Sequence, residues 1–180
     1  MLALERLTTE YISIEDRIRL TGLIPDGRTI TLWITQRMLG MLLPHLLTWL
    51  GRKYEQTSKS ASRRDAAVTD MMQSFAQESA VSSLKSQEQE AVRATAQDQG
   101  LLVHSIDITT GDLGVRIIFK TTACPEEFEA IHLTMEDEAL RQWLFILYMQ
   151  ARNGGWPLSA WPSWIQDQTA EESRQKISAH

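Results

Sequence analysis

The chain has 180 residues, of which 43% are hydrophobic and 23% are charged, and its formal net charge is −5. This composition is typical of a folded globular protein of one domain and excludes an intrinsically disordered chain. The longest apolar run, residues 38–50, is shorter than the roughly 18 residues that a membrane-spanning helix requires, so no membrane association is expected. Because a single cysteine, Cys124, allows no internal disulfide, we expect a reducing, cytoplasmic setting.

Charge is spread unevenly along the chain. The first 65 residues contain ten Lys and Arg against seven Asp and Glu, whereas the remaining residues contain eight against sixteen. Five basic residues gather near the end of the first part: Arg52, Lys53, Lys59, Arg63 and Arg64. In a chain that is acidic overall, such a cluster favours a solvated linker over a nucleic-acid contact.

The N-terminal part is predicted to begin with three strands. Residues 4–14, 17–24 and 28–35 are rich in Ile, Leu and Thr and alternate, at least in part, between apolar and polar positions. Alternation with a period of two is typical of half-buried strands. Between the second and third segments, Pro25, Asp26 and Gly27 predict a tight turn.

A strongly apolar helix is predicted to follow the third strand. Thr35 is a suitable N-cap, and the leucines of residues 38–50 recur three and four positions apart. Gly51 is predicted to end this helix. Pro44 cannot donate a backbone hydrogen bond, so it either kinks the helix or breaks it into two.

Residues 55–100 are predicted to form a polar connector. Helix-forming residues dominate from residue 66 to residue 96, and the alternatives are one or two exposed helices or disorder from about residue 80 to residue 98. A thin apolar stripe runs along the first helical part: Val68, Met71, Met72 and Phe75. We expect this stripe to dock on the chain's own domain, and a partner or a second copy of the chain is the alternative.

The plan of three strands and a helix recurs after residue 100. Residues 102–110, 115–122 and 128–134 show the strand pattern. Thr134 is predicted to cap a helix that continues to about residue 152 and has acidic residues in its first turn. The following Asn-Gly-Gly sequence is predicted to end this helix.

These elements predict an α+β domain with a mainly antiparallel sheet. Two similar strand–strand–strand–helix halves, residues 1–54 and 101–153, are joined by the connector, residues 55–100, and are followed by a Trp- and Pro-rich extended tail, residues 154–180. The two halves share a pattern rather than an identity of sequence, which suggests an internal repeat. All parts are expected to unfold together as one cooperative domain.

The tail contains Trp156, Trp161 and Trp164 within nine residues, together with Pro157 and Pro162. The prolines disfavour helix and predict a stiff, extended path. Such a segment can close a seam between helix and sheet, or it can present its rings to a partner. We favour the closing role, because burial of large aromatic rings stabilises a chain of this size.

No pattern of residues predicts catalysis. The four histidines are not paired with one another or with Cys124, and His132 with Glu136 lacks the further ligands that zinc requires. Glycine-rich phosphate-binding motifs and a Gly-x-Ser-x-Gly motif are also missing from the sequence. We therefore predict no enzymatic activity, no metal and no cofactor.

The remaining hypothesis is a protein-interaction or assembly module that associates with itself or with another protein. Its candidate surface consists of six residues: Trp156, Trp161, Trp164, Met71, Met72 and Phe75. A first alternative is single-stranded nucleic-acid binding through tryptophan stacking, with phosphate contacts from a basic cluster: Arg52, Lys53, Arg63 and Arg64. The acidic net charge disfavours it. A second alternative is a pocket for a small apolar or sugar ligand beside the tail's rings.

Overall fold

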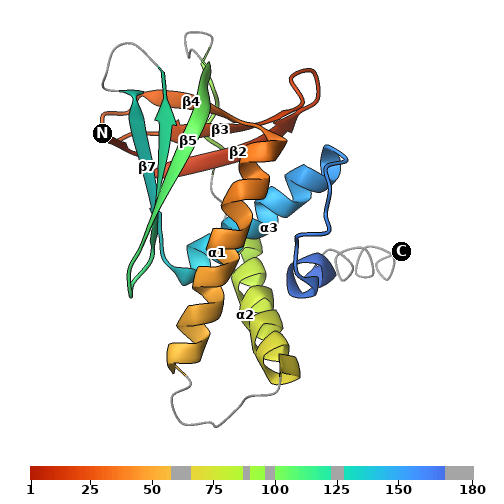
Figure 1. Ribbon diagram of the computed structural model, residues 1–180. Helices are drawn as coiled ribbons and strands as arrows, with labels where there is room; N and C mark the ends of the chain where they lie inside the picture. The colour runs from red at the N-terminus through yellow and green to blue at the C-terminus, as the bar shows by residue number, and fades with distance from the viewer. Residues whose placement is uncertain (58–65, 87–89, 96–99, 123–127, 169–180) are drawn as a thin grey trace.

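The computed structural model describes residues 1–57, 66–86, 90–95, 100–122 and 128–168 (Figure 1). Its elements in chain order are β1 (Leu2–Ala3), β2 (Arg6–Ile12), β3 (Arg17–Leu23), β4 (Thr29–Ile34), α1 (Gln36–Thr57), α2 (Ala66–Ser86), β5 (Gly100–Thr110), β6 (Val115–Thr121), β7 (Ala130–Met135) and α3 (Asp137–Asn153). A short helix over 163–168 follows. The α+β class is confirmed. The predictions for Lys59, Arg63, Arg64 and Cys124 lie outside the described residues.

The strands form one mixed sheet in the order β1-β7-β6-β5-β4-β3-β2. Four neighbouring pairs are antiparallel, but β1 pairs with β7 and β4 pairs with β5 in parallel. The prediction of a mainly antiparallel sheet is therefore wrong. Hairpins can be predicted from short local turns, whereas each parallel pair here joins strands that are far apart in the sequence and need a long crossover.

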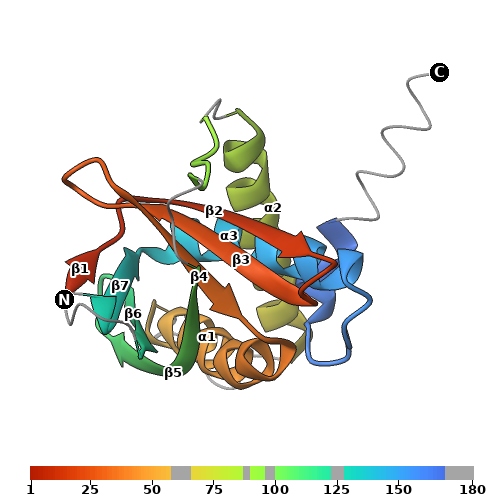
Figure 2. The ribbon, with the colours of Figure 1, turned by 90° about the horizontal axis from the view of Figure 1, so that it is seen from above.

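The N-terminal residues connect the two edges of this sheet. Strands β1 and β2 lie at opposite edges, yet only Leu4 and Glu5 separate them in the chain. The Leu4 amide donates to the carbonyl of His132 in β7, and the Glu5 amide donates to the carbonyl of Leu23 in β3, both at 2.8 Å. The sheet is thus curved until its edges meet (Figure 2). Gly22 of β3 leaves room for the Leu4 side chain, because a Cβ atom at position 22 would lie only 2.6 Å from Leu4 Cδ2.

The helices form layers beside the sheet. α1 and α3 bury apolar faces in the common core, including Leu46, Leu50, Leu140 and Leu144, and α2 packs on α3 (Figure 1). α1 and α2 extend past the lower end of the sheet in this view. Among the described residues, no helix combines the length and the hydropathy that crossing a bilayer would require.

α1 begins as predicted but continues further. The Thr35 hydroxyl accepts a hydrogen bond from the Met38 amide at 3.2 Å, which confirms the N-cap. The helix passes through Pro44 without a break and includes Gly51, so the predicted end at Gly51 is wrong. A glycine inside a helix costs only about 1 kcal/mol relative to alanine, and burial of the adjacent Leu50 outweighs that cost.

α3 begins later than the sequence predicts. Thr134 lies in β7, and the N-cap is Glu136, whose side chain makes no capping hydrogen bond. The strand continues because Met135 is buried and extends the alternation of Ile131 and Leu133 on the core face. The predicted end of the helix before the two glycines is confirmed, with Gly154 as the C-cap.

Candidate interaction surface

The three tail tryptophans, Trp156, Trp161 and Trp164, all lie in the core. Their exposed fractions are 5%, 4% and 8%. The ring of Trp161 meets Tyr148 of α3 edge to face, with 5.5 Å between centroids. The ring of Trp156 meets Tyr11 of β2 in the same way at 5.8 Å. These rings face protein, so they form no exposed aromatic surface and are not available to stack on bases.

The tail is not extended throughout. Residues 163–168 are helical, which contradicts the predicted extended path for this part. The helix starts directly after Pro162, whose carbonyl accepts from the Ile165 amide at 3.1 Å. Proline disfavours the interior of a helix but is well tolerated at its start, so its position marks where the helix begins.

Asp16 fixes the tail to the β2–β3 turn. Its Oδ1 atom accepts hydrogen bonds from Trp156 Nε1 and from the Tyr11 hydroxyl, both at 2.9 Å. Its φ of 47° lies in the left-handed region, which Asp tolerates better than most residues. The bonds from Trp156 and Tyr11 hold the pKa of the Asp16 carboxyl below its usual value, and the bond to Asp16 raises the pKa of Tyr11.

These contacts predict a pH dependence of stability. The pKa of Asp16 is lower in the folded chain, so its ionised form stabilises the fold above the ordinary Asp pKa, and this contribution is lost as the pH falls through the folded pKa. Asp16→Asn, which tolerates the same backbone conformation, should be less stable than wild type near neutral pH. The difference should shrink in urea titrations as the pH falls to about 3.

Asp112→Asn, which changes an exposed carboxylate in the β5–β6 turn, is the matched control. The stability difference between Asp112→Asn and wild type should not shrink as the pH falls in the way that is expected for Asp16→Asn. A difference between wild type and Asp16→Asn that stays constant over the whole titration would contradict a role for the Asp16 charge.

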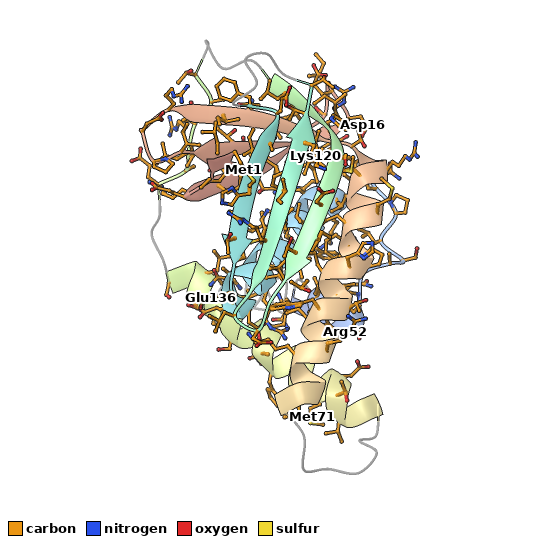
Figure 3. The ribbon with its side chains drawn as sticks, turned by 60° about the vertical axis from the view of Figure 1, so that its left-hand side comes forward. Met1, Asp16, Arg52, Met71, Lys120 and Glu136 are labelled. Atoms are coloured by element: carbon orange, nitrogen blue, oxygen red, sulfur yellow. The ribbon has the colours of Figure 1, made fainter. Side chains whose placement is uncertain are left out.

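α2 turns its apolar stripe away from the domain, contrary to the expectation that this stripe docks on the chain's own body. The exposed fractions of its four residues are 43% for Val68, 59% for Met71, 38% for Met72 and 65% for Phe75. Met71 lies at the end of the molecule that is remote from the sheet (Figure 3). The apolar stripe of α2 is therefore a continuous exposed surface on one side of a helix.

The opposite face of α2 buries polar side chains against α3. Gln73 and Gln77 are 4% and 0% exposed, and Arg141 of α3 is 2% exposed. Arg141 Nη2 donates to Gln73 Oε1 at 2.7 Å, and Gln77 Nε2 donates to the carbonyl of Arg141 at 3.0 Å. Arg141 Nε also donates to Asp137 Oδ1 at 2.7 Å, and its guanidinium lies 5.6 Å from the ring of Trp164. These hydrogen bonds offset part of the cost of burying the guanidinium and the amides, although Gln77 Oε1 is buried without a hydrogen-bond partner among the described residues.

Sequence reasoning missed this buried polar cluster. One signal was present, because Arg141 interrupts the apolar face of α3 immediately after Leu140. Gln73 and Gln77 are also four residues apart, a spacing that places both on one side of a helix. Arg141 and the two glutamines lie on different helices, and only the contact between α2 and α3 shows that they form one cluster.

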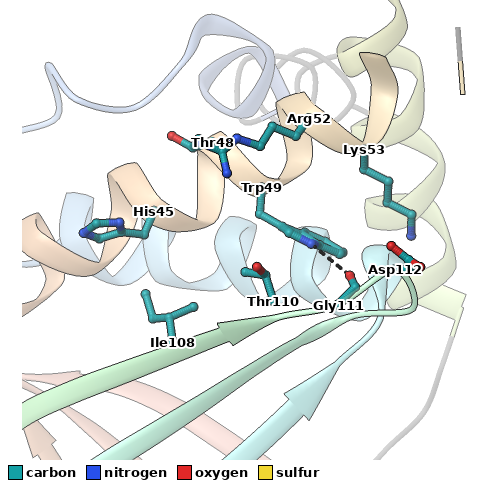
Figure 4. Close-up of a pocket in the computed structure, with 9 residues that line it drawn as sticks. All are labelled: His45, Thr48, Trp49, Arg52, Lys53, Ile108, Thr110, Gly111 and Asp112. Carbon is teal, nitrogen blue, oxygen red and sulfur yellow. Dashed lines mark hydrogen bonds between the residues drawn. The ribbon is translucent and has the colours of Figure 1, made fainter. Parts of the chain in front are cut away.

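Arg52 and Lys53, two of the predicted nucleic-acid contacts, line a cleft of about 390 Å³ between α1 and the end of β5 (Figure 4). Lys53 Nζ lies 5.1 Å from the centroid of the Trp49 ring and 3.8 Å from Asp137 Oδ2. Trp49 Nε1 donates to the Gly111 carbonyl at 3.3 Å. The ring of Trp49 is 7% exposed, so this cleft offers no open aromatic face for a base. Arg63 and Arg64 lie outside the described residues.

His132 is a packed strand histidine rather than part of a cluster. Arg116 Nη2 donates to His132 Nε2 at 2.8 Å. Burial, and then the Arg116 charge, lower the pKa of His132. Within the part of the chain that the structure describes, no three His, Cys, Asp or Glu side chains are grouped to hold a metal ion.

Of the predicted site residues, the structure gathers only Met71, Met72 and Phe75 into an exposed surface, and Val68 extends it. The tail tryptophans are buried, and the two described basic residues lie in a separate cleft. The candidate interaction surface is therefore the exposed face of α2, and the buried polar cluster lies on the opposite face of the same helix. Comparison with protein-family models, with curated proteins and with solved structures gave no match.

Proposed function

We propose that this chain is a non-enzymatic protein-interaction module of the cytoplasm that pairs with a second copy of itself through the apolar stripe of α2. The orientation of α2 carries the proposal. A helix that packs on a single body normally turns its apolar stripe toward that body, whereas α2 turns Gln73 and Gln77 inward and the stripe outward. Burial of side chains such as Phe and Met is favourable by about 1.5 to 3 kcal/mol each, so a second helix would be stabilised there.

The spacing of the stripe favours an identical partner. Val68, Met71, Met72 and Phe75 are placed symmetrically about the midpoint between the two methionines. In an antiparallel pair about a twofold axis, Val68 of one copy then faces Phe75 of the other, and Met71 faces Met72. A twofold interface requires such a self-complementary surface. The small Val opposite the large Phe and the flexible Met pair suit close packing.

The predicted dimer is weak. Four side chains on one helix bury less area than the roughly 800 Å² per partner of a standard stable interface. We therefore expect a monomer–dimer equilibrium that depends on concentration in the micromolar range or above, rather than an obligate dimer.

Phe75→Glu should shift this equilibrium to the monomer, because the charge would replace the largest apolar side chain of the stripe and cannot be buried in the interface without a partner. Sedimentation velocity from low-micromolar to near-millimolar concentration measures it. Ile14→Glu is the matched control, because Ile14 is 90% exposed in the β2–β3 turn and lies outside the stripe. A wild-type chain that stays monomeric throughout, or a dimer that Phe75→Glu leaves intact, would overturn the proposal.

Cysteine cross-linking tests the antiparallel arrangement. In a Cys124→Ser background, Met72→Cys lies near the proposed axis and should form a disulfide with its own copy. Val68→Cys and Phe75→Cys should cross-link efficiently with each other when the two variants are mixed, and poorly with themselves. Efficient self-cross-linking at both positions 68 and 75 would instead indicate a parallel pair.

We also infer that the two halves of the fold are copies of one unit. Thr31 and His132 each lie four residues before a helix N-cap, Thr35 or Glu136. Thr31 pairs in parallel with Gly100 at the start of β5, and His132 pairs in parallel with Ala3 of β1. Each of the two corresponding strands, β4 and β7, thus pairs in parallel with the first strand of the other unit. This correspondence supports the internal repeat, with β5 matching β1 and β2 together.

A further inference from the structure

The molecule also has a cavity, which lies apart from the apolar stripe of α2. A cavity of about 650 Å³ lies between the start of α1, the β2–β3 turn and the tail, where Figures 1 and 2 show the beginning of α1 beside the end of α3. Its floor is formed by buried apolar residues that include Leu39, Leu43, Trp156 and Trp161. Volumes between about 300 and 1,000 Å³ with apolar walls are typical of small-molecule sites.

Gly40 lines this cavity without a side chain. A Cβ atom built on Gly40 meets no heavy atom within 4 Å, although the residue lines the cavity. Glycine is less favourable than alanine inside a helix, and no close contact at this position requires it. The helix backbone is therefore accessible at the point where a side chain would fill the space.

The charges at the rim point to an anionic ligand. Glu15 and Arg17 form an ion pair at 3.8 Å, and the carboxylate of Asp16 is occupied by Tyr11 and Trp156. Arg37 also lines the cavity and is exposed, and the structure records no ion pair for it among the described residues. The Asp16 carboxylate stays charged, because its two partners are neutral, so the charged lining residues sum to zero. Arg37 is nevertheless the rim cation for which the described residues supply no ion pair, and its guanidinium is available to an anionic group.

We propose that this cavity binds a small apolar molecule that carries one carboxylate or similar anionic group. Its apolar part would lie against Leu43 and Trp161, over Gly40, and its anionic group would pair with Arg37. An anionic group can form charge-assisted hydrogen bonds with a guanidinium, whereas a neutral hydroxyl forms weaker ones. A sugar is a poorer fit, because its hydroxyl groups would need several polar partners and the floor of the cavity is apolar.

Anilinonaphthalene sulfonate, which is apolar and anionic, is a suitable probe. Its fluorescence should rise with saturable, single-site binding, and decanoate should displace it more effectively than decanol. Gly40→Leu should abolish this binding by filling the cavity, and Arg37→Gln should weaken decanoate binding about two- to fivefold with little effect on decanol. Thermal unfolding of Gly40→Leu confirms that the variant is folded, and Arg37→Gln tests the site without altering the helix core.

Two controls separate this site from the rest of the molecule. Arg52→Gln removes a cation near the other end of α1 and should leave binding unchanged. Phe75→Glu removes the exposed stripe, so persistence of probe binding in this variant shows that the probe occupies the cavity. Unchanged binding in folded Gly40→Leu, loss of binding in Phe75→Glu, or equal competition by decanoate and decanol would overturn the proposal. None of these results depends on whether the chain dimerises.

Discussion

Trp161→Ala is expected to lower the free energy of unfolding by about 3 to 5 kcal/mol, the usual cost of truncating a fully buried tryptophan. Trp161 is 4% exposed and packs edge to face on Tyr148 of α3. The substitution removes the buried ring surface and leaves a cavity that the rigid segment between Pro157 and Pro162 cannot readily fill. Because small domains are stable by only about 5 to 15 kcal/mol in total, the variant should melt far below wild type.

Urea titration followed by circular dichroism measures this difference. Phe75→Ala is the matched control, since it truncates an aromatic ring that is 65% exposed and should change stability by less than about 0.5 kcal/mol. Deletion of residues 154–180 should destabilise the chain more than Trp161→Ala alone, because three buried rings are lost together. A truncated chain with the stability of wild type would contradict the covering role of the tail.

The local parts of the fold could be predicted from the sequence. Strands β2, β3, β4, β5, β6 and β7 follow alternating residues, and Thr35 marks the start of α1 through a hydrogen bond within one turn. The two parallel pairings could not be predicted, because the residues that meet, such as Thr31 and Gly100, lie far apart in the chain. β1 was missed because two residues are too few to show a period.

The candidate surface could be predicted in part. The spacing of Met71, Met72 and Phe75 correctly indicated one face of a helix, but the direction of that face was wrong. Periodicity shows that apolar residues share a face and does not show where that face points. Arg141 donates to Gln73 on the opposite face of α2, and the sequence alone does not show that these two residues meet.

Arg141→Ala is expected to lower the free energy of unfolding by about 2 to 5 kcal/mol, because truncating a buried side chain leaves a cavity and removes hydrogen bonds. Arg141 is 2% exposed and bonds to Asp137 and Gln73 at 2.7 Å. Its loss leaves the Gln73 amide buried with one partner fewer. A double-mutant cycle with Gln73→Ala should give a coupling energy of about 0.5 to 3 kcal/mol, and strictly additive effects would contradict the contact.

The same cluster is expected to fix the orientation of α2. If Gln73→Leu, Gln77→Leu and Arg141→Met are combined, the buried charge and both amides disappear, and such replacements are often neutral or stabilising. α2 would then have an apolar residue on either face, so nothing would favour its present rotation over one that buries Met71 and Phe75. We expect the methionine methyl groups of Met71 and Met72 to become less accessible to a soluble paramagnetic probe in NMR, and the dimer to weaken. Unchanged accessibility in this triple variant would show that the chain connections of α2, rather than its glutamines, set which face it presents.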